Sequence, residues 1–233
     1  MRTLLVGNLM MALLSANLDA LSQDCKNYYF MNKGAEVEMT VYDRKGEVDG
    51  RNVYKVNEVK NSSNRTEANV STVSYNNKGK EQMSTGNMTV ICEGGMYSAD
   101  LRNLVSPEMM GGMKGMDVRV TGNMAEYPSS LQPGMALKDA NMTAEPTTEG
   151  MALMRLSVSL KNRKVEGKES ITSPAGTFDC YKITYDASVK TIIGINFQAT
   201  EWFAPGFGVV KTESSRNGKL MGSTLITKVS KAQ

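Results

Sequence analysis

The chain has 233 residues, and its 27 Lys and Arg side chains nearly balance 24 Asp and Glu side chains, which gives a net charge of +3. Because the two signs are interspersed, this balance predicts no nucleic-acid partner and demands no anionic membrane surface. The sequence contains no His, which removes the most common general base, the Ser-His and Cys-His nucleophile pairs and imidazole metal sites.

Catalytic groups that work without His are a Ser-Lys pair or two carboxylates. No S-x-x-K or G-x-S-x-G pattern marks such a group. Mixed-charge runs such as 163–169 (RKVEGKE) are typical of solvated strand faces and turns, and we take them as surface. We therefore expect a protein that is not an enzyme and that holds no metal and no cofactor.

A signal peptide is predicted for residues 1–22. Arg2 gives a positive start, an apolar run over 4–14 follows, and small residues stand at Ala20 and Ser22, where the signal peptidase needs them. The apolar run is too short to cross a bilayer comfortably. The alternative is an N-terminal core helix, which the order of charge, apolar centre and small residues disfavours. We expect export to the periplasm, or to an extracellular or outer-membrane-associated location.

Period-2 alternation of apolar residues predicts antiparallel strands along the rest of the chain. The segments 37–41 (VEMTV) and 156–161 (LSVSLK) each place an apolar residue at every second position, so that one face meets a core and the other meets water. Short turns built on Gly separate such runs, at 43–46, 76–79, 93–95 and 216–219. Because no linker divides the chain and no further apolar run is long enough to span a membrane, we expect residues 23–233 to form a single antiparallel β domain without a transmembrane segment.

The middle of the chain breaks this pattern. The stretch that begins at Asp100 suits one or two helical turns, and Pro107 and the Gly residues after it prevent a longer helix. We therefore expect a short helical segment near residues 100–106. The densest group among the 18 methionines of the chain lies directly after it, at Met109, Met110, Met113 and Met116.

Three interpretations of these methionines stay open. They fill a core, they form an adaptable apolar surface for a ligand or partner, or they bind Cu(I) through their thioethers. Core filling comes first and copper last, because Met is also scattered through ordinary strands and no His or Cys reinforces the cluster.

Three cysteines, Cys25, Cys92 and Cys180, would enter an oxidising compartment, where one pair can close. Their spacing fits no C-x-x-C motif and leaves every pairing open. We predict a Cys25–Cys92 disulfide, which tethers the mature N-terminus, and a buried Cys180 thiol in a core strand. Lipid attachment at Cys25 is disfavoured, because Gln23 and Asp24 stand where small residues would be expected.

Two phrases of the sequence are more specific than its composition. The segment 171–183 (ITSPAGTFDCYKI) resembles the P-A-G-T-F-x-C-x-K-I hallmark of a family of exported bacterial β-proteins that is common in Bacteroidetes and sometimes labelled TapB-like. The segment 201–211 (EWFAPGFGVVK) resembles the second hallmark of that family, W-[FY]-A-P-G-x-G-x-V-K. The likeness also takes in 25–29 and 42–46, with Phe30 where relatives often have Pro. It implies a fold similar to the curved, incompletely closed antiparallel barrels of the LolA and LolB lipoprotein carriers, and it implies no catalytic residues.

The same phrases have a structural interpretation from their residues alone. Pro205 and Gly206 favour a type II turn, and Gly208 allows a bulge. Trp202 and Phe203 provide the largest aromatic anchor in a chain with only 6% aromatic residues.

We expect an all-β envelope protein that binds an apolar small molecule, a lipid or a peptide on the concave face of a curved sheet, because the mouths of such sheets are common ligand sites. The alternative is a structural or assembly accessory that engages another envelope protein through its surface or a strand edge. As a hypothesis, the segment 101–116 is a mobile cover over one opening of the sheet. The predicted ligand or cover residues are Leu101, Leu104, Met109, Met110, Met113, Met116, Trp202 and Phe203.

Overall fold

The structure, a computed structural model, describes residues 28–104, 117–148, 151–152 and 155–230. Two short 3-10 helices occur in these residues, η2 (Tyr29–Met31) and η3 (Leu101–Leu104). The strands are β1 (Glu36–Asp43), β2 (Val48–Asn61), β3 (Arg65–Asn76), β4 (Glu81–Glu93), β5 (Met96–Ala99), β6 (Asp117–Gly122), β7 (Ala125–Pro128), β8 (Ala140–Thr148), β9 (Met151–Ala152), β10 (Leu156–Ser173), β11 (Gly176–Lys190), β12 (Gly194–Ala204), β13 (Gly208–Arg216) and β14 (Lys219–Ser230).

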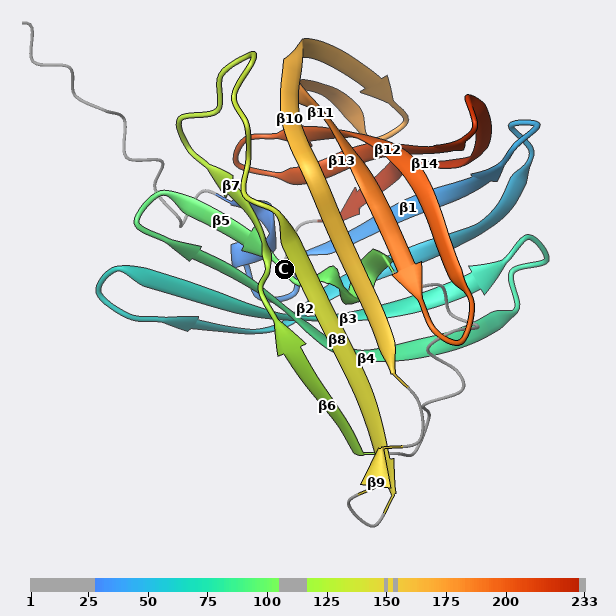
Figure 1. The fold of residues 1–233 in the computed structure, drawn as a ribbon. Helices are drawn as coiled ribbons and strands as arrows, with labels where there is room; N and C mark the ends of the chain where they lie inside the picture. The colour runs from blue at the N-terminus through green and yellow to red at the C-terminus, as the bar shows by residue number, and fades with distance from the viewer. Residues whose placement is uncertain (1–27, 105–116, 149–150, 153–154, 231–233) are drawn as a thin grey trace, which may run out of the picture.

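All the described strands belong to one 14-stranded antiparallel sheet (Figure 1). The order across the sheet is β6-β8-β10-β11-β12-β13-β14-β1-β2-β3-β4-β5-β7, and the short strand β9 pairs with β8. Many neighbours in this order are consecutive hairpins, as the alternation and the Gly turns predict. The expected all-β fold, a curved antiparallel meander that does not close into a barrel, is therefore confirmed.

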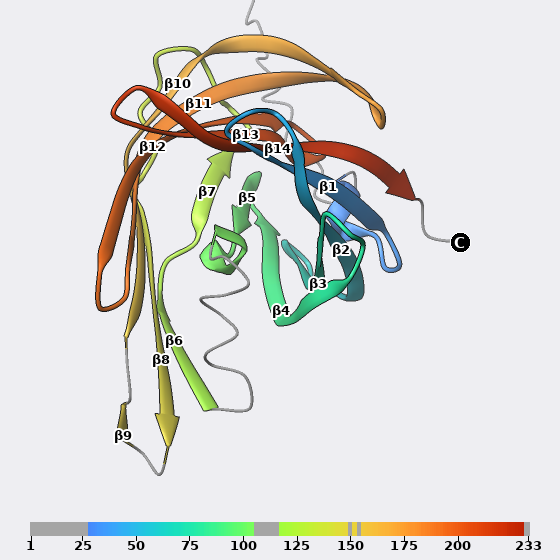
Figure 2. The same ribbon diagram turned by 90° about the vertical axis from the view of Figure 1, so that its right-hand side faces the viewer.

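The two edge strands of the sheet are neighbours in the sequence. β6 stands at one end of the strand order and β7 at the other, yet only Asn123 and Met124 separate them. This link spans at most about 11 Å, so the sheet has to curl until its two ends come near each other. Figure 2 shows the result, with β10 to β14 arching over the interior, β6 and β8 on one side and β3 and β4 on the other.

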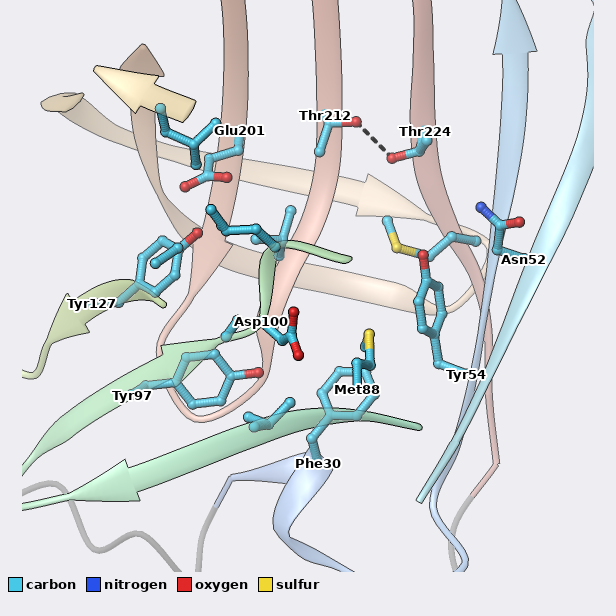
Figure 3. Close-up of a pocket in the computed structure, with 17 residues that line it drawn as sticks. Phe30, Asn52, Tyr54, Met88, Tyr97, Asp100, Tyr127, Glu201, Thr212 and Thr224 are labelled. Carbon is cyan, nitrogen blue, oxygen red and sulfur yellow. Dashed lines mark hydrogen bonds between the residues drawn. The ribbon is translucent and has the colours of Figure 1, made fainter. Parts of the chain in front are cut away.

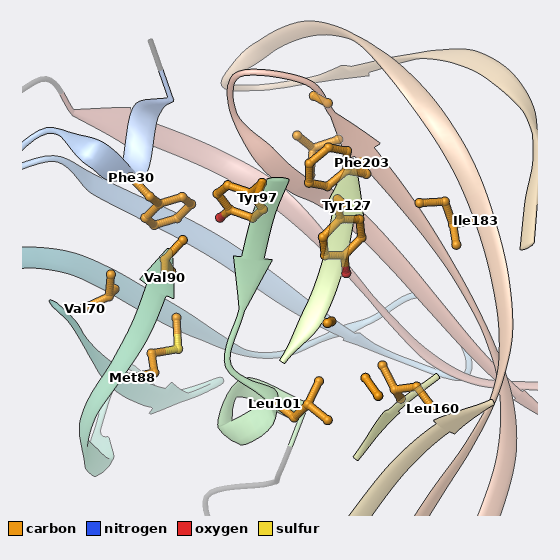
Figure 4. Close-up of a cluster of buried hydrophobic side chains, with 14 of the residues drawn as sticks. Phe30, Val70, Met88, Val90, Tyr97, Leu101, Tyr127, Leu160, Ile183 and Phe203 are labelled. Atoms are coloured by element: carbon orange, nitrogen blue, oxygen red, sulfur yellow. The ribbon is translucent and has the colours of Figure 1, made fainter. Parts of the chain in front are cut away.

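The concave face of the sheet carries the core (Figure 4). On β10, Val158 and Leu160 are buried, as the period-2 alternation predicts. Aromatic rings from distant strands extend this core. Tyr97 of β5 and Tyr127 of β7 both pack against Phe203 of β12, at centroid distances of 5.6 and 4.3 Å. Edge strand β7 therefore packs against β12 through the stacked rings of Tyr127 and Phe203.

A β-bulge in β10 turns Arg163 inward. Between the regular pairs on either side, Asn162 and Arg163 together face one residue of β11, Tyr185. Asn162 has a φ of 54°, a left-handed conformation that Asn tolerates. Even-numbered side chains point inward before the bulge, whereas Arg163 and Val165 point inward after it. The interpretation of 163–169 as surface is therefore wrong for Arg163 and Val165, which are 1% and 0% exposed.

Arg163 links β10, the third strand in the sheet order, to edge strand β7 at the far end of that order. Its Nη1 donates to the backbone oxygen of Glu126 on β7 at 3.2 Å and to that of Lys138 at 3.0 Å. Backbone hydrogen bonds run beside it: Leu137 N–H donates to Arg163 O at 2.8 Å, and Val165 N–H donates to Met135 O at 2.9 Å. The bulged part of β10 therefore binds both β7 and the chain that follows it.

The described helices are short. η3 begins after Asp100, whose carboxylate accepts a hydrogen bond from the backbone N–H of Arg102 at 2.9 Å. This confirms the expected short helical segment near residues 100–106, of which residues 105 and 106 lie outside the described part of the chain. None of the described helices is long and apolar enough to cross a membrane.

Candidate functional site

The concave face of the sheet encloses a cavity of about 140 Å³ (Figure 3). Apolar side chains on its wall include Phe30, Met39, Met88, Val90, Leu101 and Leu160. Polar side chains on its wall are Asn52, Tyr54, Tyr97, Asp100, Tyr127, Glu201, Thr212 and Thr224. A cavity of similar volume in another protein holds one benzene molecule, so the described residues leave room for one ring or a short alkyl segment.

Several polar groups on this wall already have protein partners. The hydroxyls of Thr212 and Thr224 lie 2.8 Å apart and share a hydrogen bond. The two carboxylate oxygens of Asp100 accept from the backbone N–H and from Nε of Arg102, at 2.9 and 2.6 Å. Burial raises the pKa of Tyr54 to about 12, so its hydroxyl keeps its proton at neutral pH. Thr212, Thr224 and Asp100 therefore need no ligand to satisfy them.

Two buried charged side chains, one of which lines the cavity, have polar atoms without a hydrogen-bond partner. Glu201 is 3% exposed and lines the cavity, and Arg163 is 1% exposed. Nη2 of Arg163 lies 4.0 Å from Oε1 of Glu201, which is an ion pair but too long for a hydrogen bond. Among the described residues, the buried side-chain atoms without a hydrogen-bond partner are Nε and Nη2 of Arg163 and Oε1 of Glu201. Unused donors and an unused acceptor thus lie side by side.

Neighbouring groups hold this pair in place. The hydroxyl of Tyr185 donates to Oε2 of Glu201 at 3.3 Å, and the guanidinium of Arg163 lies 4.9 Å from the centre of the Tyr127 ring. Burial raises the pKa of Glu201, and the charge of Arg163 and the hydroxyls of Tyr127 and Tyr185 oppose this rise without cancelling it. A buried carboxyl with a raised pKa on a cavity wall is a candidate for ligand contact.

The predicted ligand residues are only partly brought to this cavity. Leu101 lines the cavity and is buried. Phe203 lies in the core, where it stacks on Tyr127, and it does not belong to the cavity wall. The side chain of Leu104 and the whole of Met109, Met110, Met113 and Met116 lie outside the described residues. The cover hypothesis for the segment 101–116 therefore stays a prediction.

Trp202 lies on the opposite face of the sheet from the cavity. Successive residues of a strand point to opposite faces, so Trp202 points outward where Glu201 and Phe203 point inward. Its Nε1 donates to Glu169 Oε2 at 2.6 Å, and Nζ of Lys211 lies 4.2 Å from the centre of its ring. The expectation of one anchor made by Trp202 and Phe203 together is corrected, because their rings serve opposite faces of β12.

Sequence reasoning misses Arg163 and Glu201, although the sequence holds a signal for each. Glu201 interrupts an inward row of apolar residues on β12, with Ala199 and Phe203 two positions away on either side. On β10 the apolar residues move from even-numbered positions to the odd-numbered Val165. Such a shift of parity within one strand indicates a bulge.

The hallmark phrases meet around Phe207. Its ring lies 5.1 Å from the ring of Tyr29 and 5.1 Å from that of Phe178. The N–H of Phe207 donates to Ala204 O at 3.0 Å and Gly206 has a φ of 79°, which confirms the expected type II turn. The N–H of Tyr29 donates to Gly206 O at 2.9 Å. The phrases therefore have a structural role, fixing the N-terminal segment against β11 and the β12–β13 turn.

Cys180 is a free, buried thiol, as predicted. Burial raises its pKa to about 12. Cys92 is buried on β4, and Cys25 lies outside the described residues, so their pairing stays a prediction. Within the described part of the chain, no three His, Cys, Asp or Glu side chains gather into a group that could hold a metal ion.

Comparison with known proteins adds a family and a fold. A family model described as DUF3108-like matches residues 32–226. A solved structure from Bacteroides fragilis, of a predicted exported protein with a YmcC-like fold, is 23% identical with a TM-score of 0.73, over 88% of this chain and 99% of that chain. A predicted lipoprotein from Parabacteroides distasonis is 25% identical with a TM-score of 0.73, over 87% of this chain and 98% of that chain. No curated protein matches this chain. The TapB label and the likeness to LolA and LolB stay predictions.

Proposed function

We propose that this chain, which belongs to the DUF3108-like family, is an exported envelope protein that binds an apolar ligand on the concave face of its sheet. Export is supported by the signal-peptide pattern of residues 1–22. It is also supported by the descriptions of two similar structures as a predicted exported protein and a predicted lipoprotein. The proposed location is the periplasm or the extracellular or outer-membrane surface.

The observation that carries the ligand proposal is the cavity of about 140 Å³. Small-molecule sites are usually concave and mostly apolar, with a few polar groups that fix the orientation of the ligand. The cavity has each of these properties. Met39 and Met88 belong to its wall, and unbranched thioether side chains adapt to ligands of different shape. The volume suits one ring or the end of an alkyl chain, so a longer lipid would place only its terminal part here.

The polar groups on the wall support binding rather than catalysis. Of the two carboxylates that line the cavity, Asp100 is already occupied by Arg102. Glu201 accepts a hydrogen bond from the hydroxyl of Tyr185. Burial and the nearby Glu201 charge raise the pKa of Tyr185 well above its ordinary value, which makes this hydroxyl a poor proton donor in catalysis.

Toluene binding to the mature protein tests the ligand proposal, because toluene fits the volume of the cavity and carries no polar group. We expect saturable binding in a titration monitored by NMR. Ala99 lines the cavity, so the larger side chain of Ala99→Leu should occupy part of the cavity volume. This should weaken toluene binding by about tenfold or more, which is about 1.4 kcal/mol. Leu220→Ala, at an exposed position on β14, is the control and should leave the affinity unchanged. Absence of saturable binding, or equal affinity in Ala99→Leu, would contradict the proposal.

Native mass spectrometry of the protein purified from its own host then identifies the natural ligand. We expect an adduct of defined mass that survives gentle desolvation and that is lost in Ala99→Leu. An adduct retained equally by this variant would place the ligand elsewhere on the protein.

A second candidate function is docking to another envelope protein, and one surface feature favours it. The turn between β11 and β12 leaves Ile192 90% exposed and Ile193 77% exposed. A partner surface would remove these two adjacent aliphatic side chains from water. Site-specific crosslinking from position 192 in the native host should then give one defined adduct, and Ile193→Ser should reduce its yield. A diffuse set of adducts, unaltered by Ile193→Ser, would reject this candidate.

A further inference from the structure

We infer that the ligand of the cavity is an uncharged apolar molecule that carries a hydroxyl group, and that this hydroxyl binds between Arg163 and Glu201. The inference rests on the proposed function, since it names the chemical class that the same cavity selects. It makes Glu201 and Arg163 the residues that determine specificity, whereas the apolar wall provides affinity.

The distance between the two side chains carries this inference. Nη2 of Arg163 and Oε1 of Glu201 are 4.0 Å apart, and neither atom has a hydrogen-bond partner. A hydroxyl oxygen placed about 2.8–2.9 Å from both atoms would accept a hydrogen bond from Nη2 and donate one to Oε1. The angle between these two bonds would be about 90°, which a hydroxyl accommodates. One hydroxyl thus pairs a buried donor and a buried acceptor that are otherwise unused.

The unused atoms are held in position by the rest of each side chain. Nη1 of Arg163 is fixed by the backbone oxygens of Glu126 and Lys138, at 3.2 and 3.0 Å. Oε2 of Glu201 is held by the hydroxyl of Tyr185. What remains unpaired is Nε and Nη2 of Arg163 and Oε1 of Glu201, and of these two residues Glu201 is the one that lines the cavity. A site that is arranged before binding loses less entropy when the ligand enters.

The charges of the pair explain why the ligand should be neutral. The guanidinium of Arg163 is positively charged, and an ionised Glu201 balances that charge. A ligand carboxylate would lie against Glu201 and an ammonium group would lie near Arg163, and either would add an uncompensated charge to a buried site. A hydrocarbon would leave both atoms unpaired, which is also unfavourable. If Glu201 instead takes a proton, its neutral carboxyl still forms a hydrogen bond with a hydroxyl.

Four ligands of one size test the inference on the full mature chain. Toluene, benzyl alcohol, benzoate and benzylammonium share a ring and differ only in the attached group. We expect benzyl alcohol to bind at least about tenfold more tightly than toluene, and both charged ligands to bind more weakly than benzyl alcohol by a similar factor. Nuclear Overhauser effects from the benzyl methylene to the ring of Tyr185 should place the hydroxyl end beside Glu201.

Glu201→Gln keeps the shape of the side chain but replaces a charged acceptor by a weaker neutral one. We expect the preference for benzyl alcohol over toluene, which is the ratio of their two affinities, to fall to about threefold or less. Glu67→Gln, a surface carboxylate of β3 paired with Arg65, is the matched control and should keep the full preference. If Glu201→Gln does not fold, the four-ligand series on the unmodified protein decides alone.

The possible outcomes separate this inference from the proposed function. Toluene and benzyl alcohol of equal affinity would leave the proposed function standing and overturn the hydroxyl assignment. Tightest binding of benzoate would also overturn it, in favour of a carboxylate site at Arg163. If none of the four ligands binds, the proposed function itself fails.

Discussion

Replacing Arg163 by Met removes a buried cation that links β10 to β7 but keeps most of the apolar volume of the side chain. The variant loses the two hydrogen bonds from Nη1 to Glu126 O and Lys138 O. It also leaves Glu201, which is 3% exposed, without the cation that lies 4.0 Å away. The free energy of unfolding of Arg163→Met should therefore be lower than that of the unmodified protein.

Glu201 determines most of this loss. Without Arg163 it either stays charged in a buried site or takes up a proton. Protonating Glu201 at pH 7, from an ordinary pKa of 4.5, costs about 3.4 kcal/mol. This cost is the upper limit of what Glu201 contributes to the loss of stability. The two backbone oxygens that lose their donor add about 1 kcal/mol each where water does not reach them. We expect a total loss of about 3–5 kcal/mol, which is the range for breaking a buried ion pair.

The pH dependence of this loss has a definite sign. In Arg163→Met the folded-state pKa of Glu201 rises further above 4.5, so the folded chain binds a proton that the unfolded chain does not. The variant therefore recovers stability as the pH falls from 7 to 5, by at most about 1.4 kcal/mol per pH unit. Tyr127 and Tyr185, which also face Glu201, do not titrate in this interval because burial raises the pKa of each.

Urea denaturation followed by circular dichroism, at pH 7 and pH 5, measures both effects. Arg163→Met combined with Glu201→Leu should lose less stability than the two single variants together, with a coupling of about 1.5 kcal/mol or more, because an apolar pair replaces the charged one. Arg65→Met, which removes a surface cation, should change stability by less than about 1 kcal/mol. A loss below about 1 kcal/mol for Arg163→Met, or a loss that is equal at both pH values, would refute the reasoning.

Three further predictions concern other parts of the chain. Iodoacetamide should alkylate Cys180 at pH 8 only after unfolding, because a pKa of about 12 leaves about one thiol in ten thousand ionised; rapid labelling of the folded protein would contradict this. Gly208→Ala should lower stability by about 1–3 kcal/mol, because Gly208 has a φ of +126° and an added Cβ would lie 3.3 Å from the Tyr97 hydroxyl. Gly167→Ala, which meets no atom within 4 Å, should be neutral or slightly stabilising in the same thermal unfolding assay. The exported protein should have the intact mass of a chain that starts at Gln23, and a mass that includes Met1 would reject the predicted cleavage after Ser22.

Local residue patterns were sufficient to predict many of the strands and turns of this protein. The alternation around Val158 predicts a half-buried strand because successive side chains of a strand point to opposite faces. The turn at Pro205 and Gly206 follows from the φ preferences of those two residues. Each of these features depends on neighbours in the sequence, so a distant part of the chain alters it little.

The tertiary structure alone brought Tyr127 and Glu201 to one cavity and placed Arg163 4.0 Å from Glu201. A bulge of one residue moves Arg163 from the outer to the inner face of β10, and no charge pattern around it marks that change. Tyr127 and Glu201 belong to strands that are not neighbours in the sheet. They meet because the sheet curls until edge strand β7 lies against β12, as the stacking of Tyr127 on Phe203 shows. Such curvature is the sum of twist and bulges over many strands, so it depends on pairings between residues far apart in the sequence, which the local alternation does not encode.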